Sequence, residues 1–289
     1  MPERDAGRGP WRMGGAMRFK EFINQPLLEG GNAIKSVSKI TQSEVRASVP
    51  DLLKKIQKVL DLPSSKVKLI GSAGKKPNSS DLSGDLDIAV ECDPLIVEDH
   101  LKEFSDNNRV MKNIGVFSFA YDIGNKLVQV DLMPVKDIKF AEWSFQANED
   151  DLAQDLKGAQ RNELFFAIAK HMPQEILKKD KDGEPLEVKR YFYDLARGLM
   201  TGTRSRVNTK GKVGKNFATV DKKVISTDPE NICKLMFGKD ITPKQCSTFD
   251  GALKAINSDS FPFIDKREDI LKLTLKGIKN KNLKVPKSL

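Results

Sequence analysis

The chain has 289 residues and a formal net charge of +9 at neutral pH, with 49 Lys and Arg against 40 Asp and Glu. The sequence has no run of about 18 apolar residues, so we expect no segment to span a membrane. The three cysteines include no Cys-x-x-Cys pair, which argues against a zinc site or disulfide framework and for a reducing, cytoplasmic location. The positive charge favours an anionic partner, nucleic acid above all; solubility alone is the alternative explanation.

Residues 1–42 are predicted to form an N-terminal extension. Within it, residues 1–16 are rich in Gly, Arg and Pro and lack apolar periodicity, so we expect them to be disordered. Met17 opens a stretch typical of an ordinary chain start, which makes an upstream extension the alternative. A catalytic domain over residues 43–147 and a helical domain over residues 148–289 are predicted to follow.

The first predicted helix covers residues 43–60, where apolar residues recur at helical spacing and Ser43 is the expected cap. Pro50 lies inside this pattern. Because proline lacks a backbone N–H and restricts the preceding residue, we expect the helix to start again at Pro50 and to exclude Val49.

Two acidic residues share one face of a predicted strand. Residues 67–70 form an apolar run that ends at Gly71-Ser72, and a second run alternates with period two from Asp85 onward. That period places Asp85 and Asp87 on one face, with apolar side chains on the other. No basic residue separates the two carboxylates, so their repulsion calls for a cation between them.

A third carboxylate fits the same site. Two β-rich runs are separated by Gly124-Asn125, a two-residue hairpin signal, and the second run carries Asp131 on its polar face. If the strands are neighbours, Asp131 joins Asp85 and Asp87. Three carboxylates, with room for water and phosphate oxygens, suit Mg²⁺.

Gly71-Ser72, then Asp85-x-Asp87 after a gap of twelve residues, then a single distant Asp131 resemble the signature of the DNA polymerase beta-type nucleotidyltransferase superfamily. The resemblance implies an α/β fold in which a mixed β-sheet is flanked by helices. It also implies transfer of a nucleoside monophosphate from a nucleoside triphosphate to a hydroxyl, with release of pyrophosphate.

The resemblance covers about residues 45–134 and implies a role for each acid. Asp85 and Asp87 would bind the metal ion that carries the triphosphate, while Asp131 would complete a second metal site and help to deprotonate the attacking hydroxyl. The implied cofactor is a pair of Mg²⁺ ions, which Mn²⁺ can replace. Six residues are expected to contact the nucleotide: Gly71, Ser72, Lys75, Lys157, Arg161 and Asn162.

The remainder of the chain is predicted to be all-helical. A long helix over residues 152–172 carries the last three of these nucleotide contacts on one face, and another helix is expected over residues 188–200. Its expected core stripe consists of Tyr191, Leu195 and Leu199. Three further helix starts are signalled, at Asp228-Pro229, Thr242-Pro243 and Asp265.

A basic segment over residues 201–215 contains glycines and lysines, but no Gly-x-x-x-x-Gly-Lys-[Ser/Thr] pattern fits, so a P-loop is rejected. We expect a flexible loop that contacts the phosphates of an acceptor or of the triphosphate; a merely solvated loop is the alternative. The predicted nucleic-acid contacts are Arg204, Arg206, Lys210, Lys212 and Lys215.

The predicted activity is template-independent addition of nucleotides to an RNA or DNA 3′ end, because the chain lacks the extra domains of a templated repair polymerase. Nucleotidylation of a protein side chain, as in toxin-like members of the superfamily, and nucleotidylation of a small molecule are the alternatives. A nucleotide-binding module without turnover is the alternative of another class.

Overall fold

The structure is a computed structural model, and it describes Ile34 and residues 37–76, 78–105, 110–113, 115–145, 148–154, 156–208 and 211–289. The predicted disorder of residues 1–16 lies outside this part of the chain. Among the described residues, no helix combines the length and the apolar character needed to cross a bilayer.

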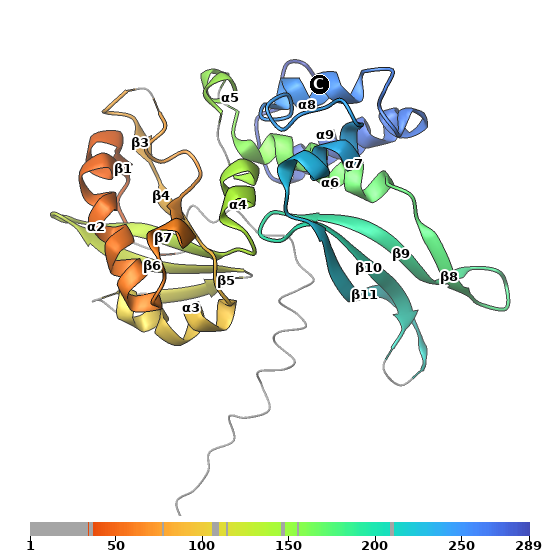
Figure 1. Ribbon diagram of the computed structural model, residues 1–289, viewed down its shortest axis with the longest axis horizontal. Helices are drawn as coiled ribbons and strands as arrows, with labels where there is room; N and C mark the ends of the chain where they lie inside the picture. The colour runs from red at the N-terminus through yellow and green to blue at the C-terminus, as the bar shows by residue number, and fades with distance from the viewer. Residues whose placement is uncertain are drawn as a thin grey trace, which may run out of the picture.

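The fold is mixed α/β, with a sheet in each half of the chain (Figure 1). The N-terminal half contains β1 (Ile40–Thr41), α2 (Gln42–Leu60), η1 (Ser64–Lys66), β2 (Val67–Leu69), β3 (Leu82–Ser83), β4 (Asp85–Val90), α3 (Pro94–His100), η2 (Leu101–Phe104), β5 (Val110–Asn113), β6 (Val116–Ile123), β7 (Lys126–Pro134) and α4 (Ile138–Ser144). The C-terminal half contains α5 (Glu149–Ala153), α6 (Gly158–His171), β8 (Glu175–Lys179), β9 (Pro185–Asp194), β10 (Gly198–Val207), β11 (Val213–Ser226), α7 (Pro229–Phe237), α8 (Phe249–Ile256), η3 (Ile264–Lys266) and α9 (Arg267–Asn280).

The N-terminal sheet has the strand order β2-β4-β7-β6-β5, with β4 and β7 parallel and the other pairs antiparallel. The predicted hairpin at Gly124-Asn125 is confirmed, since Ile123 pairs with Lys126 on either side of it. The predicted adjacency of the two acid-bearing strands is also confirmed, because Asp87 lies directly opposite Asp131.

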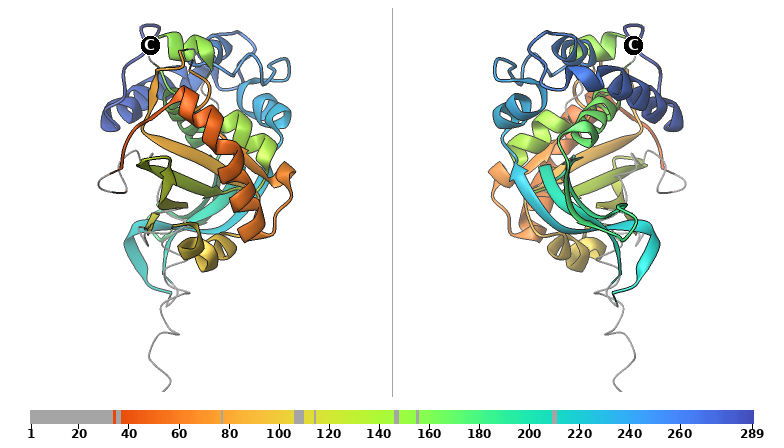
Figure 2. Two further views of the ribbon diagram at one scale, coloured as in Figure 1. Left: turned by 90° about the vertical axis from the view of Figure 1, so that its left-hand side faces the viewer. Right: turned by 90° about the vertical axis from the view of Figure 1, so that its right-hand side faces the viewer.

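The two faces of this sheet have different environments. Helix α2 crosses one face (Figure 2), where Leu52 packs into a core with Leu86 and Val130. On the other face, a smaller cluster joins Met133 of β7 to Ala141 of α4. The aspartates lie on this second face, because period two separates them from the core residues between them.

The prediction of an all-helical second domain is wrong. Strands β8 to β11 form a four-stranded antiparallel sheet in the order β11-β10-β9-β8, which lies beside α6 and α7 (Figure 1). Most of the predicted flexible basic loop belongs to β10 and β11, which pair Arg204 with Thr219. Strand β10 is buried at each of its first five positions, so its burial does not alternate and its sequence lacks a clear period-two signal.

The predicted helix over residues 188–200 is likewise wrong. Tyr191 lies on β9, Leu199 lies on β10, and Leu195 occupies the turn between them. All three nevertheless pack in or against the C-terminal core, as expected. These residues are four apart, which is also the spacing along one face of a helix. Here the turn between β9 and β10 places residues with this spacing against the same core.

Two other helix predictions also need correction. The expected helix over residues 152–172 is divided into α5 and α6 by a break around Leu156. The Thr242-Pro243 signal produces only a turn, in which Thr242 bonds to Gln245, whereas the Asp228 cap of α7 is confirmed. Local cap chemistry occurs in turns as well as in helices, which explains the false signal.

Helix α2 runs without interruption through Pro50, so the expected restart there is wrong. Val49 lies inside the helix and is buried, while Pro50 itself is exposed. An exposed proline leaves the carbonyl that loses its helical partner accessible to water. The cap is Thr41 rather than Ser43, and it forms a capping box with Glu44.

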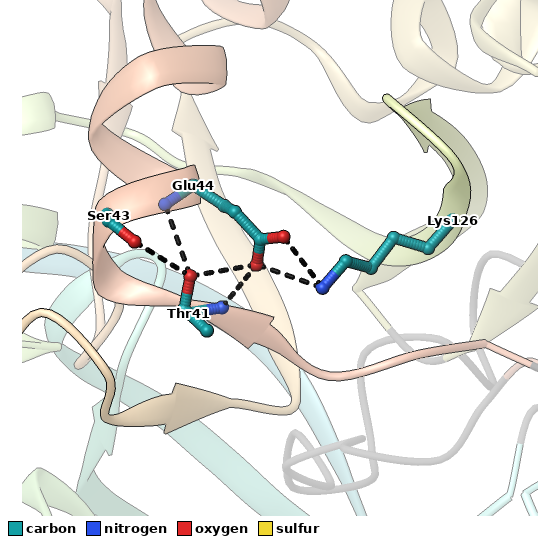
Figure 3. A network of polar contacts seen from close by, with 4 residues as sticks. All are labelled: Thr41, Ser43, Glu44 and Lys126. Atoms are coloured by element: carbon teal, nitrogen blue, oxygen red, sulfur yellow. Dashed lines mark hydrogen bonds and ion pairs between the residues drawn. The ribbon is translucent and has the colours of Figure 1, made fainter.

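This capping box is tied to the sheet (Figure 3). The Thr41 N–H donates to Glu44 Oε2 at 2.8 Å, and Lys126 Nζ lies 2.7 Å from Glu44 Oε1. The Lys126 hydrogen bond, followed by the bonds from Thr41, lowers the pKa of Glu44 from 4.5 to about 2. The network therefore joins the start of α2 to the start of β7.

We expect Glu44→Gln to lower the melting temperature at pH 7, because it removes the carboxylate from both partners. A lowered pKa stabilises the fold above the ordinary pKa of 4.5, and this contribution is lost as the pH falls towards 2. The difference in melting temperature between wild type and variant should therefore shrink between pH 4.5 and 2. Glu268→Gln, in an exposed pair with Lys272 at 3.1 Å, is the control and should change little at any pH. A pH-independent difference for Glu44→Gln would contradict the assignment.

Candidate functional site

Three carboxylates meet on the second face of the N-terminal sheet. Asp85 and Asp87 project from β4 and Asp131 from the parallel neighbour β7, with Asp87 opposite Asp131. One oxygen from each lies within 4.8 Å of the others. Hard carboxylate oxygens at this spacing can hold a metal ion.

Burial and mutual repulsion raise the pKa values of two of these acids. Burial raises the pKa of Asp85, with Lys157 and Lys76 acting in the opposite direction. Burial also raises the pKa of Asp131 to about 6; Ser118 and Gln129 lower it, and the charge of Asp85 raises it further. A cation between the carboxylates would offset both the desolvation and the mutual repulsion.

Gly71 closes one side of the site. It has a φ of 70° and follows Ile70, whose N–H donates to the Asp87 carbonyl at 2.9 Å. A Cβ at Gly71 would overlap Asp87 Oδ2 and lie 3.3 Å from Asp87 Cγ. The turn can approach the carboxylate this closely because this residue has no side chain.

Gln129 is a functional residue that the sequence interpretation missed. It is fully buried on the same face as Asp131, and its Nε2 donates to both carboxylate oxygens at 3.0 and 3.1 Å. Its Oε1 accepts the Ile34 N–H at 3.1 Å. The sequence could have indicated this contact, because residues two apart on a strand share one face. Gln129 thus fixes the orientation of the Asp131 carboxylate.

We expect Gln129→Met to weaken metal binding by roughly 10- to 100-fold, as for other groups that orient metal ligands. Methionine is similar in length but donates no hydrogen bond, so the carboxylate would rotate more freely. The metal-binding constant should be measured beside the melting temperature. Loss of stability with unchanged metal affinity would instead assign Gln129 a purely structural role.

The predicted nucleotide contacts in the first half lie beside the aspartates. Gly71 and Ser72 belong to the turn that follows β2, and the Ser72 carbonyl accepts the Lys75 N–H at 3.2 Å. Burial lowers the pKa of Lys75, while the charge of Glu142 raises it and that of Arg161 lowers it. Lys75 therefore lies where the turn faces α4 and α6.

The three predicted contacts on α6 have different surroundings. Lys157 precedes α6, and its charge acts on the Asp85 carboxyl, so it lies near the aspartates. Asn162 is buried, and its Oδ1 has no hydrogen-bond partner among the described residues.

Arg161 is fully buried, and its guanidinium donates to the carbonyls of Trp143, Ser144 and Ser247 at 2.7–2.8 Å. Its assignment as a nucleotide contact is therefore wrong. Its role is to join the end of α4 to the segment around Ser247.

Two of the predicted nucleic-acid contacts have side chains on the C-terminal sheet. Arg204 and Arg206 are on β10, and Lys212 is exposed just before β11. Lys210 and the side chain of Lys215 lie outside the described residues. The arginines are held over the Phe217 ring and are not in a flexible loop.

The arrangement can bind a metal ion beside a glycine turn, with Lys75 and Lys157 available for an anionic ligand. The charges around it come from both halves of the chain. Comparison of the chain with protein-family models gave no match, and comparison with curated proteins gave none either.

Proposed function

We propose that the protein is a Mg²⁺-dependent nucleotidyltransferase that moves a nucleoside monophosphate from a nucleoside triphosphate to a hydroxyl. The observation that carries the proposal is the meeting of Asp85, Asp87 and Asp131 on adjacent parallel strands, with Gly71 against Asp87. Mg²⁺ suits this site because it prefers a few carboxylates and completes its coordination with water and phosphate oxygens.

The residues around the acids can hold a triphosphate. The turn at Gly71 and Ser72 would present backbone N–H groups and a hydroxyl to the phosphates. Lys75 and Lys157 would add positive charge. Asn162, on the helix that follows Lys157, has a buried oxygen without a hydrogen-bond partner in the described part of the chain. These contacts would orient the α-phosphorus towards the attacking hydroxyl.

Asp131 would accept the proton of that hydroxyl, with its carboxylate oriented by Gln129. Bound Mg²⁺, for which Mn²⁺ can substitute, would stabilise the charge that develops on the entering and leaving oxygens. The O–P bond to the acceptor forms as the bond to pyrophosphate breaks, and pyrophosphate carries away the leaving electron pair.

The proposed acceptor is the 3′ end of a nucleic acid, extended without a template. The net charge of +9 and the basic sheet in the C-terminal half support this choice. Transfer to a protein side chain or to a small molecule would use the same acids, so the acceptor has to be tested directly.

The test is incubation of the protein with each α-³²P-labelled nucleoside triphosphate and Mg²⁺ or Mn²⁺, with and without short RNA or DNA. Label in a lengthened polynucleotide would support the proposal, and Asp87→Asn should give none. Label on protein or on a small molecule would reassign the acceptor. Nucleotide binding without any pyrophosphate release would overturn the enzymatic proposal in favour of a binding module.

A further inference from the structure

One face of the C-terminal sheet is covered by helices and the other is basic. Tyr193 of β9 and Leu199 of β10 pack with Phe165 of α6 and Phe237 of α7 in the C-terminal core. Period two directs the residues between them to the opposite face. We call this opposite face the arginine face; it includes Arg190, Phe192, Arg204, Arg206, Phe217 and Lys222. Buried Met200 and Val188 also lie on it, opposite Phe192 and Arg204.

The arginines of this face lie over aromatic rings. The Arg190 guanidinium carbon is 4.6 Å from the centre of the Phe192 ring, and that of Arg204 is 4.5 Å from the centre of the Phe217 ring. Arg206 reaches the same Phe217 ring at 5.9 Å. A guanidinium over a ring is restricted in orientation, so its outer plane can stack on a ligand. The Arg206 Nε–H already donates to the Gly214 carbonyl at 3.2 Å.

The cations on this face are crowded. Burial, and then the charge of Arg204, lowers the pKa of Arg190 to about 10, and the Arg190 Nε has no hydrogen-bond partner among the described residues. Burial, and then Arg197, lowers the pKa of Lys222 to about 8. Asp194, the acid that partly offsets Lys222, already accepts two bonds from the Arg197 side chain at 3.1 and 2.6 Å. An anionic ligand would relieve this like-charge repulsion.

Gly202 lies beneath two side chains of this face. A Cβ there would lie 3.2 Å from the Phe192 ring and 3.3 Å from Lys222 Cγ. The absence of a side chain at this buried position lets the ring and the lysine stem pack closely against the backbone. The planar groups above it suit the stacking of flat bases, while the guanidinium edges suit phosphates.

The sheet is joined to the catalytic half close to the aspartates. Ala196, in the turn between β9 and β10, accepts the Lys136 N–H at 2.8 Å and packs against the cluster that includes Val135. Val135 follows Asp131 by four residues, which is about 13 Å along a strand. The turn between β9 and β10 is therefore the end of the C-terminal sheet that lies nearest to the site of transfer, and Arg204 follows Ala196 by eight residues, about 26 Å along a strand.

We propose that the arginine face binds a single-stranded polynucleotide, the acceptor whose 3′ end is extended at the aspartates; this last part rests on the proposed function. The phosphates of a single strand would contact the charged edges of the guanidinium groups, and its bases would stack on the planar groups of this face. A duplex offers the phosphates but hides its bases, so it is the weaker ligand for this face.

The test uses the full chain with Asp87→Asn, so that turnover plays no part, and fluorescent 12-nucleotide single strands of RNA and DNA. Adding Arg190→Gln with Arg204→Gln should raise the dissociation constant at least about tenfold and flatten the salt slope by about 1.4 for two lost phosphate contacts. Lys272→Gln with Lys279→Gln, exposed on α9, removes the same charge and should change neither value. Circular dichroism and melting temperature must match between the two double variants.

A second pair of substitutions separates stacking from charge. Arg190→Lys with Arg204→Lys keeps the charge but removes the planar groups, so we expect several-fold weaker binding with the salt slope retained. Equal binding by all variants would overturn the proposal. The proposal would also be overturned if a duplex or anionic lipid vesicles bound more tightly than the single strand and if that binding depended equally on the two arginines. If the single strand bound as expected but the wild-type protein showed no transfer activity, the proposed function would be rejected and the binding face would stand.

Discussion

Replacing Asp87 by asparagine is expected to lower the rate of nucleotidyl transfer by roughly 10³-fold or more. Metal ions contribute several kcal/mol of charge stabilisation in such reactions, and each 1.36 kcal/mol is about tenfold in rate. Asp87 lies between its neighbours, with Asp85 two residues before it and Asp131 opposite it on β7. The amide has nearly the same shape but lacks the charge that a divalent ion requires.

The same substitution should leave the fold intact. Without metal, removing one of three neighbouring carboxylates relieves repulsion, so the melting temperature should stay equal or rise. With Mg²⁺ added, only the wild type should gain stability, because ligand binding to the folded state stabilises it by mass action. Calorimetry with Mg²⁺ and Mn²⁺ gives the binding constants for both proteins.

Asp51→Asn is the matched control, since Asp51 is exposed on α2, away from the three carboxylates, and forms an ion pair with Lys54 at 3.3 Å. It should retain wild-type transfer and metal binding. If Asp87→Asn turned over at the wild-type rate, the assignment of the metal centre would be wrong.

Replacing Gly71 by alanine is expected to reduce transfer by at least about 10²-fold, because a misplacement of about 1 Å at a reacting centre has this effect. The new Cβ would collide with Asp87 Oδ2, so either the carboxylate or the turn must move. The φ of 70° adds backbone strain of about 1 kcal/mol.

Gly124→Ala separates the collision from the strain. Gly124 has a comparable φ of 63°, but a Cβ there would meet nothing within 4 Å. Both variants should therefore lose a similar amount of stability, and only Gly71→Ala should lose activity and metal affinity. Equal activity in the two variants would show that the approach of Gly71 to Asp87 has no functional role.

The metal centre was predicted from sequence because each of its features is local. Period two places Asp85 and Asp87 on one strand face, and the Gly124-Asn125 hairpin fixes which face of β7 carries Asp131. The parallel pairing of β4 and β7 was the one non-local step, and it needed only the assumption that the two strands are neighbours.

The structure of the C-terminal half was mispredicted where the local sequence pattern was ambiguous or where the contacts join residues that are distant in the sequence. Strand β8 is exposed at every position, and the buried residues around the turn after β9 are four apart, as on a helix. Arg161 was expected to contact the nucleotide because its spacing places it on one helix face with Lys157 and Asn162. Its carbonyl partners, however, come from segments 17 to 86 residues away. Their convergence is a property of packing.

The sequence by itself determined the three acids, the glycine turn before them and the strands that carry them, because side-chain period and turn chemistry act over a few residues. Only the tertiary structure decided that Gln129 holds Asp131, that Gly71 lies against Asp87 and that a second sheet follows the N-terminal half. These features depend on contacts between distant segments. They form where burial of apolar surface brings those segments together, and no local sequence pattern indicates which distant segments will be neighbours.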